Sequence, residues 1–314
     1  MTALFDVILP VFLVVGFGYL VCWRKWLSEV AVDGVMRFAQ NFALPVLLFG
    51  AIAGLDLGAN YKPLLLLAFY SGALLSFALG TALSLYWLRR PAEDAIAIGF
   101  VCLFSNSLLL GVPITERAYG PEAVLGNFTI ISIHSPLLYT FGITAMEFVR
   151  ARGQNLSLGG VALRALSGVL HTPLVIGILC GFAVNLSMQA GLVLPQGFWA
   201  AVKMMSNAAL PAALFGLGGV LYRYRPEGEA RAIALCCGAS LLLHPAVTFG
   251  LGKLFALNLA EMRSAVLTAA MPPGVNAYIF AALYGVAKRV SASAVLVATA
   301  LSVLTVWFWL AVLP

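Results

Sequence analysis

The chain has 314 residues, of which 62% are hydrophobic and 10% charged, and its mean hydropathy is +1.00. A soluble domain carries about 25% charged residues, so a soluble globular protein is excluded and an integral membrane protein is indicated. The net charge of +6 comes from basic residues scattered over many short segments, which argues against a nucleic-acid-binding surface.

Ten segments are apolar over about 20 residues, the length that a membrane-spanning helix needs. They are 3–22, 30–53, 63–88, 95–120, 123–148, 166–189, 198–221, 231–256, 264–287 and 291–313. No basic region precedes the first apolar run, so we expect a retained helix there rather than a signal peptide. The longest link, 151–165, is predicted to be a cytoplasmic linker between two halves, 1–150 and 166–314. The links leave no room for a soluble catalytic domain.

Basic residues are distributed unevenly between the loops. Loops after even-numbered segments contain four of them, namely Lys62, Arg117, Lys253 and Arg263. Loops after odd-numbered segments contain twelve: Arg24, Lys25, Arg89, Arg90, Arg150, Arg152, Arg164, Arg223, Arg225, Arg231, Lys288 and Arg289. Because Lys and Arg are enriched in cytoplasmic loops, we expect the odd loops in the cytoplasm and both termini outside.

One short stretch of the chain occurs twice. NFALPVLLFG at 41–50 and NAALPAALFG at 207–216 share seven of ten positions, and a basic residue stands four places before each Asn (Arg37, Lys203). The copies fall in the second and seventh segments, which cross the membrane in opposite directions. Five helices followed by five antiparallel equivalents form the inverted repeat typical of secondary transporters.

The fourth and ninth segments contain the strongest helix breakers, in SNSLLLGVPI (105–114) and MPPGVNAYIF (271–280). Pro removes a backbone donor and Gly loosens the helix. Unwound backbone at this depth is tolerated only inside protein or beside a cavity. Two breaks at equivalent places therefore predict a binding site at the membrane midplane. The alternative is a pair of proline kinks whose polar neighbours only satisfy freed backbone groups.

Such a site suits an anion, because each break exposes the N-terminus of one half-helix with its free amides and partial positive charge. The side chains expected to line it are Ser105, Asn106, Ser107 and Asn276. Asn41 and Asn207, one turn before Pro45 and Pro211, either line the same cavity or hydrogen-bond between helices.

Ionisable residues are few inside the predicted helices, and no pair of carboxylates for ion antiport is expected at the midplane. His134, His171 and His244 each precede a proline, but their predicted depths differ and no HExxH spacing occurs, so no metal site is expected. Imidazole titrates near neutral pH, which leaves a proton-linked role open for His134 and His244. The five cysteines form no CxxC pair and are expected to be core residues.

Four stretches resemble those of a known family: NFALPVLLF, NSLLLGVPI, NAALPAALFGLGGVL and MPPGVNAYIFAALYG. With them the chain resembles the auxin efflux carrier family in its short bacterial form, over nearly its whole length. The resemblance implies a fold of sodium/proton-antiporter type, whose broken fourth and ninth helices cross between a scaffold and a transport domain. The family's crossover positions correspond to Asn106, Gly111, Pro113, Pro272, Pro273 and Asn276. The fourth-helix motif differs from the family's usual form at Ser107, Leu108 and Leu109.

The resemblance also implies transport of organic anions: auxin in plants, and malonate, malate or other carboxylates in bacteria. We therefore predict a ten-helix secondary transporter of a small mono- or dicarboxylate in the bilayer of a bacterial inner membrane, without enzymatic activity, cofactor or nucleic-acid partner. A proton or a sodium ion is the candidate coupling ion, and a second copy of the chain is a candidate partner. Helices 3–5 and 8–10 are expected to move against helices 1, 2, 6 and 7. The alternatives are a coupled transporter of another solute, an intramembrane enzyme, or a channel.

Overall fold

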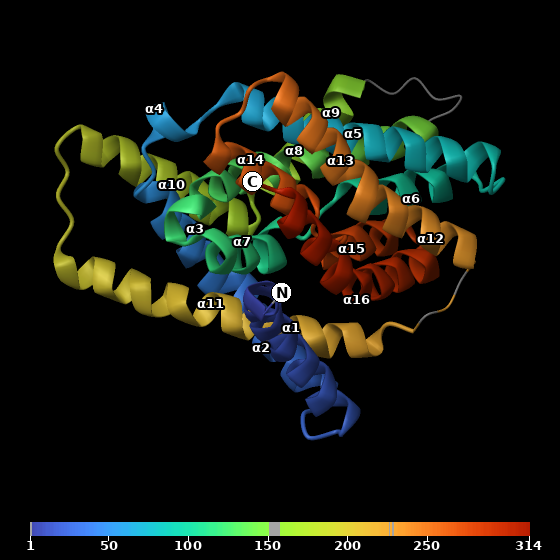
Figure 1. Cartoon of the computed structure of the whole chain (residues 1–314), viewed down its shortest axis with the longest axis horizontal. Coiled ribbons are helices and arrows are strands. Elements are labelled where there is room, and N and C mark those ends of the chain that lie inside the picture. The colour runs from blue at the N-terminus through green and yellow to red at the C-terminus, as the bar shows by residue number, and fades with distance from the viewer. Residues whose placement is uncertain (1, 151–157, 226, 228) are drawn as a thin grey trace.

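The computed structural model describes residues 2–150, 158–225, 227 and 229–314, and every regular element in this part of the chain is a helix (Figure 1). Of the predicted linker, residues 151–157, including Arg152, lie outside the described residues. The all-helical result follows from composition. Apolar segments in a bilayer must satisfy their backbone groups internally, and a helix does so within one segment.

The first half of the chain begins with α1 (Thr2–Trp23). One long helix follows, made of α2 (Glu29–Phe38), the π-helical segment η1 (Ala39–Ala43) and α3 (Leu44–Ala53). The short α4 (Leu57–Asn60) precedes α5 (Pro63–Tyr86). The fourth predicted segment is interrupted and consists of α6 (Ala92–Leu103), the π-helical η2 (Ser107–Gly111) and α7 (Val112–Tyr119). A 3₁₀ turn, η3 (Pro121–Val124), then enters α8 (Leu125–Arg150).

The second half begins with α9 (Leu158–Leu170) and α10 (Pro173–Gln189), followed by α11 (Gln196–Arg223). The next long helix comprises α12 (Ala230–Gly238), the π-helical η4 (Ala239–Leu243) and α13 (His244–Leu254). The ninth predicted segment is interrupted as well, into α14 (Leu259–Ala269) and α15 (Val275–Tyr284). The last helix is α16 (Lys288–Val312).

Three of the long helices widen just before a proline. The π-helical segments η1, η2 and η4 each end two residues before Pro45, Pro113 and Pro245 respectively. Proline lacks an N–H and clashes with the carbonyl four residues earlier, and a widened turn relieves that conflict without ending the helix. The proline does not by itself require the wider turn, because α11 passes through Pro211 as a regular α-helix.

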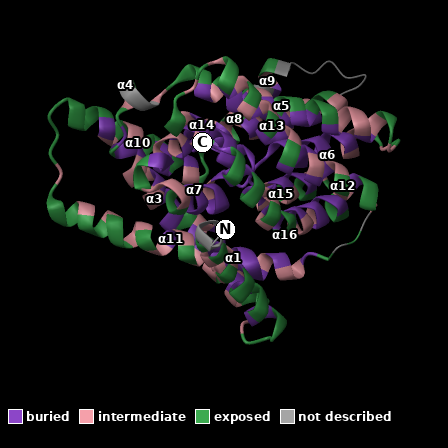
Figure 2. Ribbon diagram, in the orientation of Figure 1, coloured by how far each residue is buried: buried purple, intermediate pink, exposed green. Residues whose placement is uncertain are grey.

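Seven helices of the described residues are long and apolar enough to cross a membrane, or eight if α9 and α10 form one bent span. The predicted all-helical membrane protein is confirmed. The pieces on either side of the two interruptions, α6, α7, α14 and α15, are shorter than that criterion, so the ten-span inverted repeat stays a prediction. Figure 2 shows exposed residues along outer helices such as α11, where even Met204 is 75% exposed. Such apolar exposure fits a surface that faces lipid.

The sixth predicted segment differs from expectation. It was expected as one helix over 166–189, but a helix begins at Leu158, breaks at 171–172 and bends by 80° into α10. The bend has a local cause: Thr172 is extended (φ −74°, ψ 143°), as the residue before a proline prefers to be. α9 therefore runs across the direction of α10 rather than extending it.

Glycines bring one group of helices into close contact. A Cβ added at Gly18 of α1 would lie 2.9 Å from the carbonyl carbon of Phe215 in α11, and one added at Gly218 would lie 2.7 Å from the amide nitrogen of Tyr19. A Cβ at Gly177 of α10 would likewise lie 2.9 Å from the carbonyl carbon of Pro45 in α3. Backbones approach this closely only where side chains are absent, so α1 packs tightly on α11 and α3 on α10.

A second group of helices shares the largest hydrophobic core, which includes buried residues of α5, α6, α8, α12, α14, α15 and α16. At its centre the rings of Phe100 and Phe280 stack, with centroids 3.9 Å apart. A buried polar link adds to it: the Asn127 amide of α8 donates to the Thr115 hydroxyl of α7 (3.1 Å) and to the Thr268 hydroxyl of α14 (2.9 Å). These contacts join segments from both halves of the chain.

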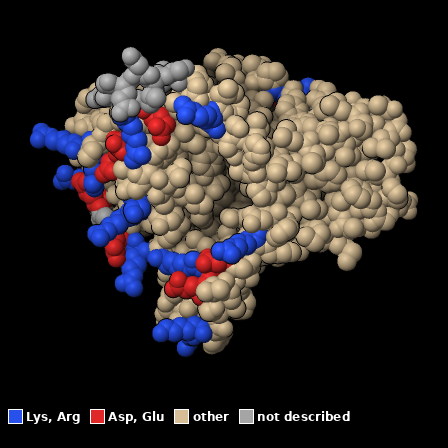
Figure 3. Space-filling model, turned by 180° about the vertical axis from the view of Figure 1, so that it is seen from behind, with Lys and Arg blue, Asp and Glu red and all other residues tan. Residues whose placement is uncertain are grey.

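Charged residues gather at one end of the face shown in Figure 3, and few lie at the opposite end. Ion pairs connect the loops that were predicted to be cytoplasmic with neighbouring helix starts: Arg90 with Glu229 (3.0 Å), Arg150 with Glu93 (2.8 Å) and Arg223 with Asp33 (2.8 Å). The loops after the third, fifth and seventh predicted segments therefore lie on the same side.

Two arginines from the even-numbered loops contact the two ends of the chain instead. Arg117 donates to the carbonyl oxygens of Asp6 (2.8 Å) and Val7 (3.2 Å), and Arg263 donates to that of Pro314 (2.7 Å). Both ends of the chain therefore lie beside the loops that contain Arg117 and Arg263.

Candidate functional site

Both predicted helix breaks are present. α14 ends at Ala269 and α15 starts at Val275 after an extended Gly274 (φ −74°, ψ 161°). The sequence explains this break, because Pro272 and Pro273 remove two consecutive backbone donors and force the residues before them out of the helical conformation. The other break, at 104–106, contains no proline. Asn106 has φ −77° and ψ 59° there, and the helix resumes at Ser107.

The two breaks pair with each other through their backbones. The Asn106 amide donates to the Pro272 carbonyl (2.8 Å), and the Gly274 amide donates to the Phe104 carbonyl (2.9 Å). Ser105 and Pro273 thereby form an isolated antiparallel β-bridge. Groups freed by each interruption are satisfied by the other, which is how unwound backbone is accommodated inside a membrane protein. The two interrupted helices therefore meet at their breaks.

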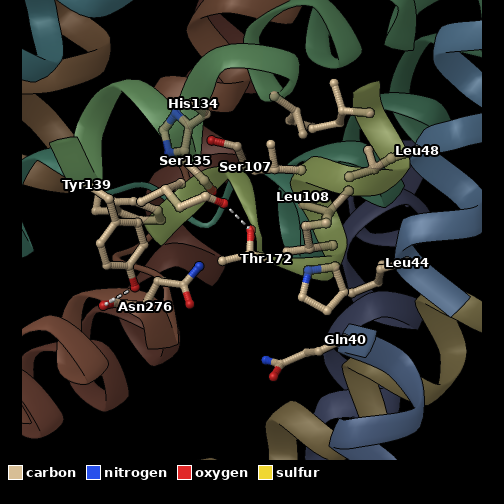
Figure 4. Close-up of a pocket in the computed structure, with 18 of the residues that line it drawn as sticks. Gln40, Leu44, Leu48, Ser107, Leu108, His134, Ser135, Tyr139, Thr172 and Asn276 are labelled. Carbon is tan, nitrogen blue, oxygen red and sulfur yellow. Dashed lines mark hydrogen bonds between the residues drawn. The ribbon is translucent and has the colours of Figure 1, made fainter. Parts of the chain in front are cut away.

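A cavity of about 480 Å³ adjoins this crossing (Figure 4). Its walls come from η1 and α3, the first break with η2, α8, α9 with α10, and the start of α15. Figure 4 shows Asn276 and Tyr139 together on one side of the cavity and Gln40 and Leu44 on the other. Its volume is within the range of about 300–1,000 Å³ typical of small-molecule sites.

Six of the predicted site residues line this cavity. They are Asn41, Ser105, Asn106, Ser107, His134 and Asn276. The Ser105 and Ser107 hydroxyls lie 2.8 Å apart and hydrogen-bond to each other. The Tyr139 hydroxyl donates to the backbone carbonyl of Asn276 (3.1 Å), so this bond does not use the Asn276 side-chain amide. The polar side chains at both breaks thus reach one common space.

The other six predicted residues lie elsewhere: Gly111, Pro113, Asn207, Pro272, Pro273 and His244 do not line the cavity. Pro272 and Pro273 contribute backbone pairing instead, and the Gly111 amide donates to the Asn106 carbonyl (3.2 Å). Pro113 is buried within α7 and Asn207 is exposed on α11. His244 is 1% exposed, and its Nε2 lies 3.2 Å from the Phe69 carbonyl oxygen, with which it hydrogen-bonds.

Backbone amides add donors to the cavity. Among the described residues, the amides of Leu108 and Leu109 at the start of η2, and those of Val275 and Asn276 at the start of α15, have no backbone hydrogen-bond partner. All four residues line the cavity. The starts of two half-helices thus present free N–H groups to the same space, and these are groups that bind anions.

Sequence reasoning missed several lining residues, most importantly Arg164 in α9. It is the only Asp, Glu, Lys or Arg among the described residues that line the cavity. Its Nε donates to the Gly160 carbonyl one turn earlier (3.3 Å), and no carboxylate of the described chain pairs with it. Arg164 falls within the predicted linker 151–165, whereas the structure places it in α9. The signal for an amphipathic helix was the spacing of Val161, Ala165 and Val169, which recur every four residues and are buried.

The comparison with protein families decides which kind of membrane protein this is. A family model described as "Membrane transport protein" matches residues 3–310. The chain belongs to this transporter family. An intramembrane enzyme is thereby excluded, and the predicted relationship to auxin efflux carriers is confirmed by the relatives that match over nearly the full chain.

Three of these relatives show the breadth of the family. The "Putative malonate transporter" of Rhizobium meliloti is 26% identical over 309 residues, covering 98% of this chain and 94% of the relative. "Auxin efflux carrier component 5" of Arabidopsis thaliana is 22% identical, covering 92% of this chain and 90% of its own. "Uncharacterized transporter YfdV" of Escherichia coli is 21% identical, covering 96% and 95%. Full-length matches at low identity indicate a shared fold across different cargoes.

Proposed function

We propose that this transporter is a carrier of small organic anions, mono- or dicarboxylates, which bind in the cavity beside the crossed breaks. The observation that carries the proposal is the chemistry of the lining. Two helix starts with free amides, three asparagines and one arginine without a carboxylate partner line the cavity, and no carboxylate among the described residues does. The arginine and the amides at the two helix starts favour a negative ligand.

The family comparison supports a carboxylate as the cargo. One full-length relative bears the name malonate transporter, and others are auxin efflux carriers. The cavity, at about 480 Å³, is larger than a small dicarboxylate needs, so water or a larger acid can share it. The lining is otherwise apolar, with residues such as Leu44, Leu48 and Ile178, which suits the hydrocarbon part of an organic acid.

We also propose that the chain spans the membrane ten times as a 5+5 inverted repeat, with the interrupted segments as the fourth and ninth spans. Three observations support this arrangement: the duplicated stretch at 41–50 and 207–216, the two breaks that meet each other, and the separation of odd-numbered from even-numbered loops. With the odd loops in the cytoplasm, both termini face outward in a bacterial inner membrane.

In this orientation the cavity lies on the cytoplasmic side of the crossing. Tyr139 lies in the half of α8 that ends at Arg150. Asn276 lies on the half-helix α15, which leads to the link before Lys288 at the start of α16. Thr172 lies at the α9–α10 bend, which follows the cytoplasmic linker. The structure then represents an inward-facing state, and alternating access requires a second state that opens the same site outward.

The moving parts follow from the packing. α5, α6, α8, α12, α14, α15 and α16 share one core and correspond to helices 3–5 and 8–10. Among helices 1, 2, 6 and 7, glycines bring the backbones of helices 1 and 7 and of helices 2 and 6 together, and Gly50 and Gly216 pack helices 2 and 7 against each other's side chains. We propose that the first group moves against the second, with the cavity at their boundary.

Uptake by proteoliposomes tests the proposal. Purified protein is reconstituted and offered labelled malonate, malate, lactate and indole-3-acetate. We expect saturable uptake of at least one. The N106A and N276A variants should weaken its apparent affinity by about tenfold or more, since a hydrogen bond to a charged group contributes about 1.5–3 kcal/mol. N207A is the matched control, because Asn207 occurs in a similar context but lies outside the cavity. Normal affinity in both site variants would show that the anion binds elsewhere.

A further inference from the structure

His134 is a buried polar side chain that no other side chain pairs with. It lies in α8, lines the cavity and is 4% exposed. Neither ring nitrogen has a hydrogen bond of normal geometry within the described part of the chain, and the polar group that acts on the ring is the backbone of Ser105 in the first break. A neutral imidazole has one donor and one acceptor nitrogen, and buried polar groups are normally paired. An unpaired imidazole beside a ligand cavity therefore calls for a functional explanation.

Aromatic rings surround this imidazole. The ring centroid of His134 lies 4.8 Å from that of Phe104 in an edge-on arrangement, and 5.7 Å from that of Phe69. Phe104 belongs to the first break, so His134 sits directly behind the crossing. In such surroundings a protonated imidazole has little water to stabilise it and needs a nearby negative charge.

None of the titratable groups that face His134 supplies that charge. Tyr70 of α5 contacts the ring directly, with centroids 6.2 Å apart. His244 of α13 shares the neighbouring ring of Phe69, and Tyr139 of α8 shares that of Phe104. Arg164 of α9 lines the same cavity. The histidine, the arginine and the tyrosines are neutral or positive at neutral pH. No described Asp or Glu lines the cavity. The only candidate for a counter-charge is a ligand.

We propose that His134 takes up a proton when an organic anion occupies the cavity, so that the anion and the proton cross the membrane together. The proton adds to the unprotonated ring nitrogen, and no bond in the anion breaks. The anion stabilises the imidazolium and the imidazolium attracts the anion, and such coupling is reciprocal. With the cavity empty, the proton leaves. This inference rests on the proposed anion transport and adds its coupling ion.

His244 is the natural comparison. It is also buried, at 1% exposed, and its ring packs against Phe69 as well, with centroids 4.9 Å apart. However, its Nε2 hydrogen-bonds to the Phe69 carbonyl oxygen and the residue does not line the cavity. The structure thus separates two histidines that the sequence could not distinguish, and assigns the proton to His134 alone.

Malonate uptake under an imposed pH gradient tests this assignment. The proteoliposomes contain wild type, H134Q or H244Q, and potassium with valinomycin clamps the membrane potential. For one proton per anion, each unit of inwardly directed pH gradient should raise wild-type malonate accumulation about tenfold. H134Q should lose this dependence on the gradient, whereas H244Q should keep it. A second measurement needs no variant: malonate added to purified wild type in weak buffer should cause proton uptake beyond that of the malonate alone.

Three results would overturn the assignment. H134Q, correctly folded and active, could keep the full dependence on the pH gradient. Wild type could transport malonate without responding to the gradient and without taking up protons, and the proposed anion transport would then stand without a proton. Finally, wild type could fail to transport any anion of the wider panel, and the proposed function and the coupling would then fall together.

Discussion

Replacing Gly18 by alanine should separate two helices that touch through their backbones. An added Cβ would lie 2.9 Å from the Phe215 carbonyl carbon, and closer still to its oxygen. Carbon atoms at optimal separation are about 3.5–4.0 Å apart, so α1 and α11 must part by about 0.6 Å or more at this point. Both partners are backbone, and no side-chain rotation can relieve the clash.

The cost can be estimated from overpacking in other proteins, which is about 1–3 kcal/mol. We take the upper end, about 3 kcal/mol, because the clash is with backbone. Alanine gains about 1 kcal/mol over glycine in a helix, so G18A should lose about 2 kcal/mol. At about 2–4 °C per kcal/mol, its melting temperature should fall by about 4–8 °C.

G16A is the matched control, because a Cβ at Gly16, two residues earlier in α1, meets no atom within 4 Å. It should be as stable as wild type or gain up to about 1 kcal/mol. The assay is thermal unfolding of detergent-solubilised protein, followed by tryptophan fluorescence for both variants in the same detergent. A G18A protein that melts at or above the temperature of G16A would refute the close backbone packing of α1 on α11.

Three further outcomes are expected. R164Q should raise the KM for anion uptake several-fold, and more at low salt, because it removes the only charged side chain of the described cavity lining. R289Q is its exposed control, and equal effects of both on KM would contradict a role in the cavity. N127L should destabilise the protein by about 2 kcal/mol, because two buried threonine hydroxyls lose their donor; an unchanged unfolding midpoint would contradict this. E229Q should cost less than about 1 kcal/mol, because its ion pair with Arg90 is partly exposed, and a larger loss of thermal stability would show that the pair is structurally important.

The spans followed from the sequence to within a few residues wherever the helix is long and apolar. The expected 63–88 corresponds to α5 at Pro63–Tyr86, and the expected 198–221 to α11 at Gln196–Arg223. The reason is that a lipid-facing segment has one main way to satisfy its backbone, and hydropathy alone identifies it. Hydropathy did not identify the start of α9, because this helix is amphipathic and lies beside a cavity rather than in lipid.

The two helix breaks differ in how far their own residues explain them. Pro272 and Pro273 predict the break before Val275, because their missing donors are a local property. The break at 104–106 has no such cause in its own residues, and Pro113 lies beyond it inside a continuous helix. This chain segment stays unwound because the Asn106 amide and the Phe104 carbonyl bond to the other break. Only the tertiary structure brings those partners together.

The repeated stretches show most clearly what local sequence cannot predict. Asn41 and Asn207 occur in the same local sequence, N-x-A-L-P, and the sequence alone determined that this stretch occurs twice. Yet Asn41 lies within the π-helical η1 and lines the cavity, whereas Asn207 lies on a regular α-helix and does not line it. The difference comes from the neighbours, because the elements packed around each copy are not the same. Local sequence specifies the repeated stretch, but which copy faces the cavity depends on the tertiary packing.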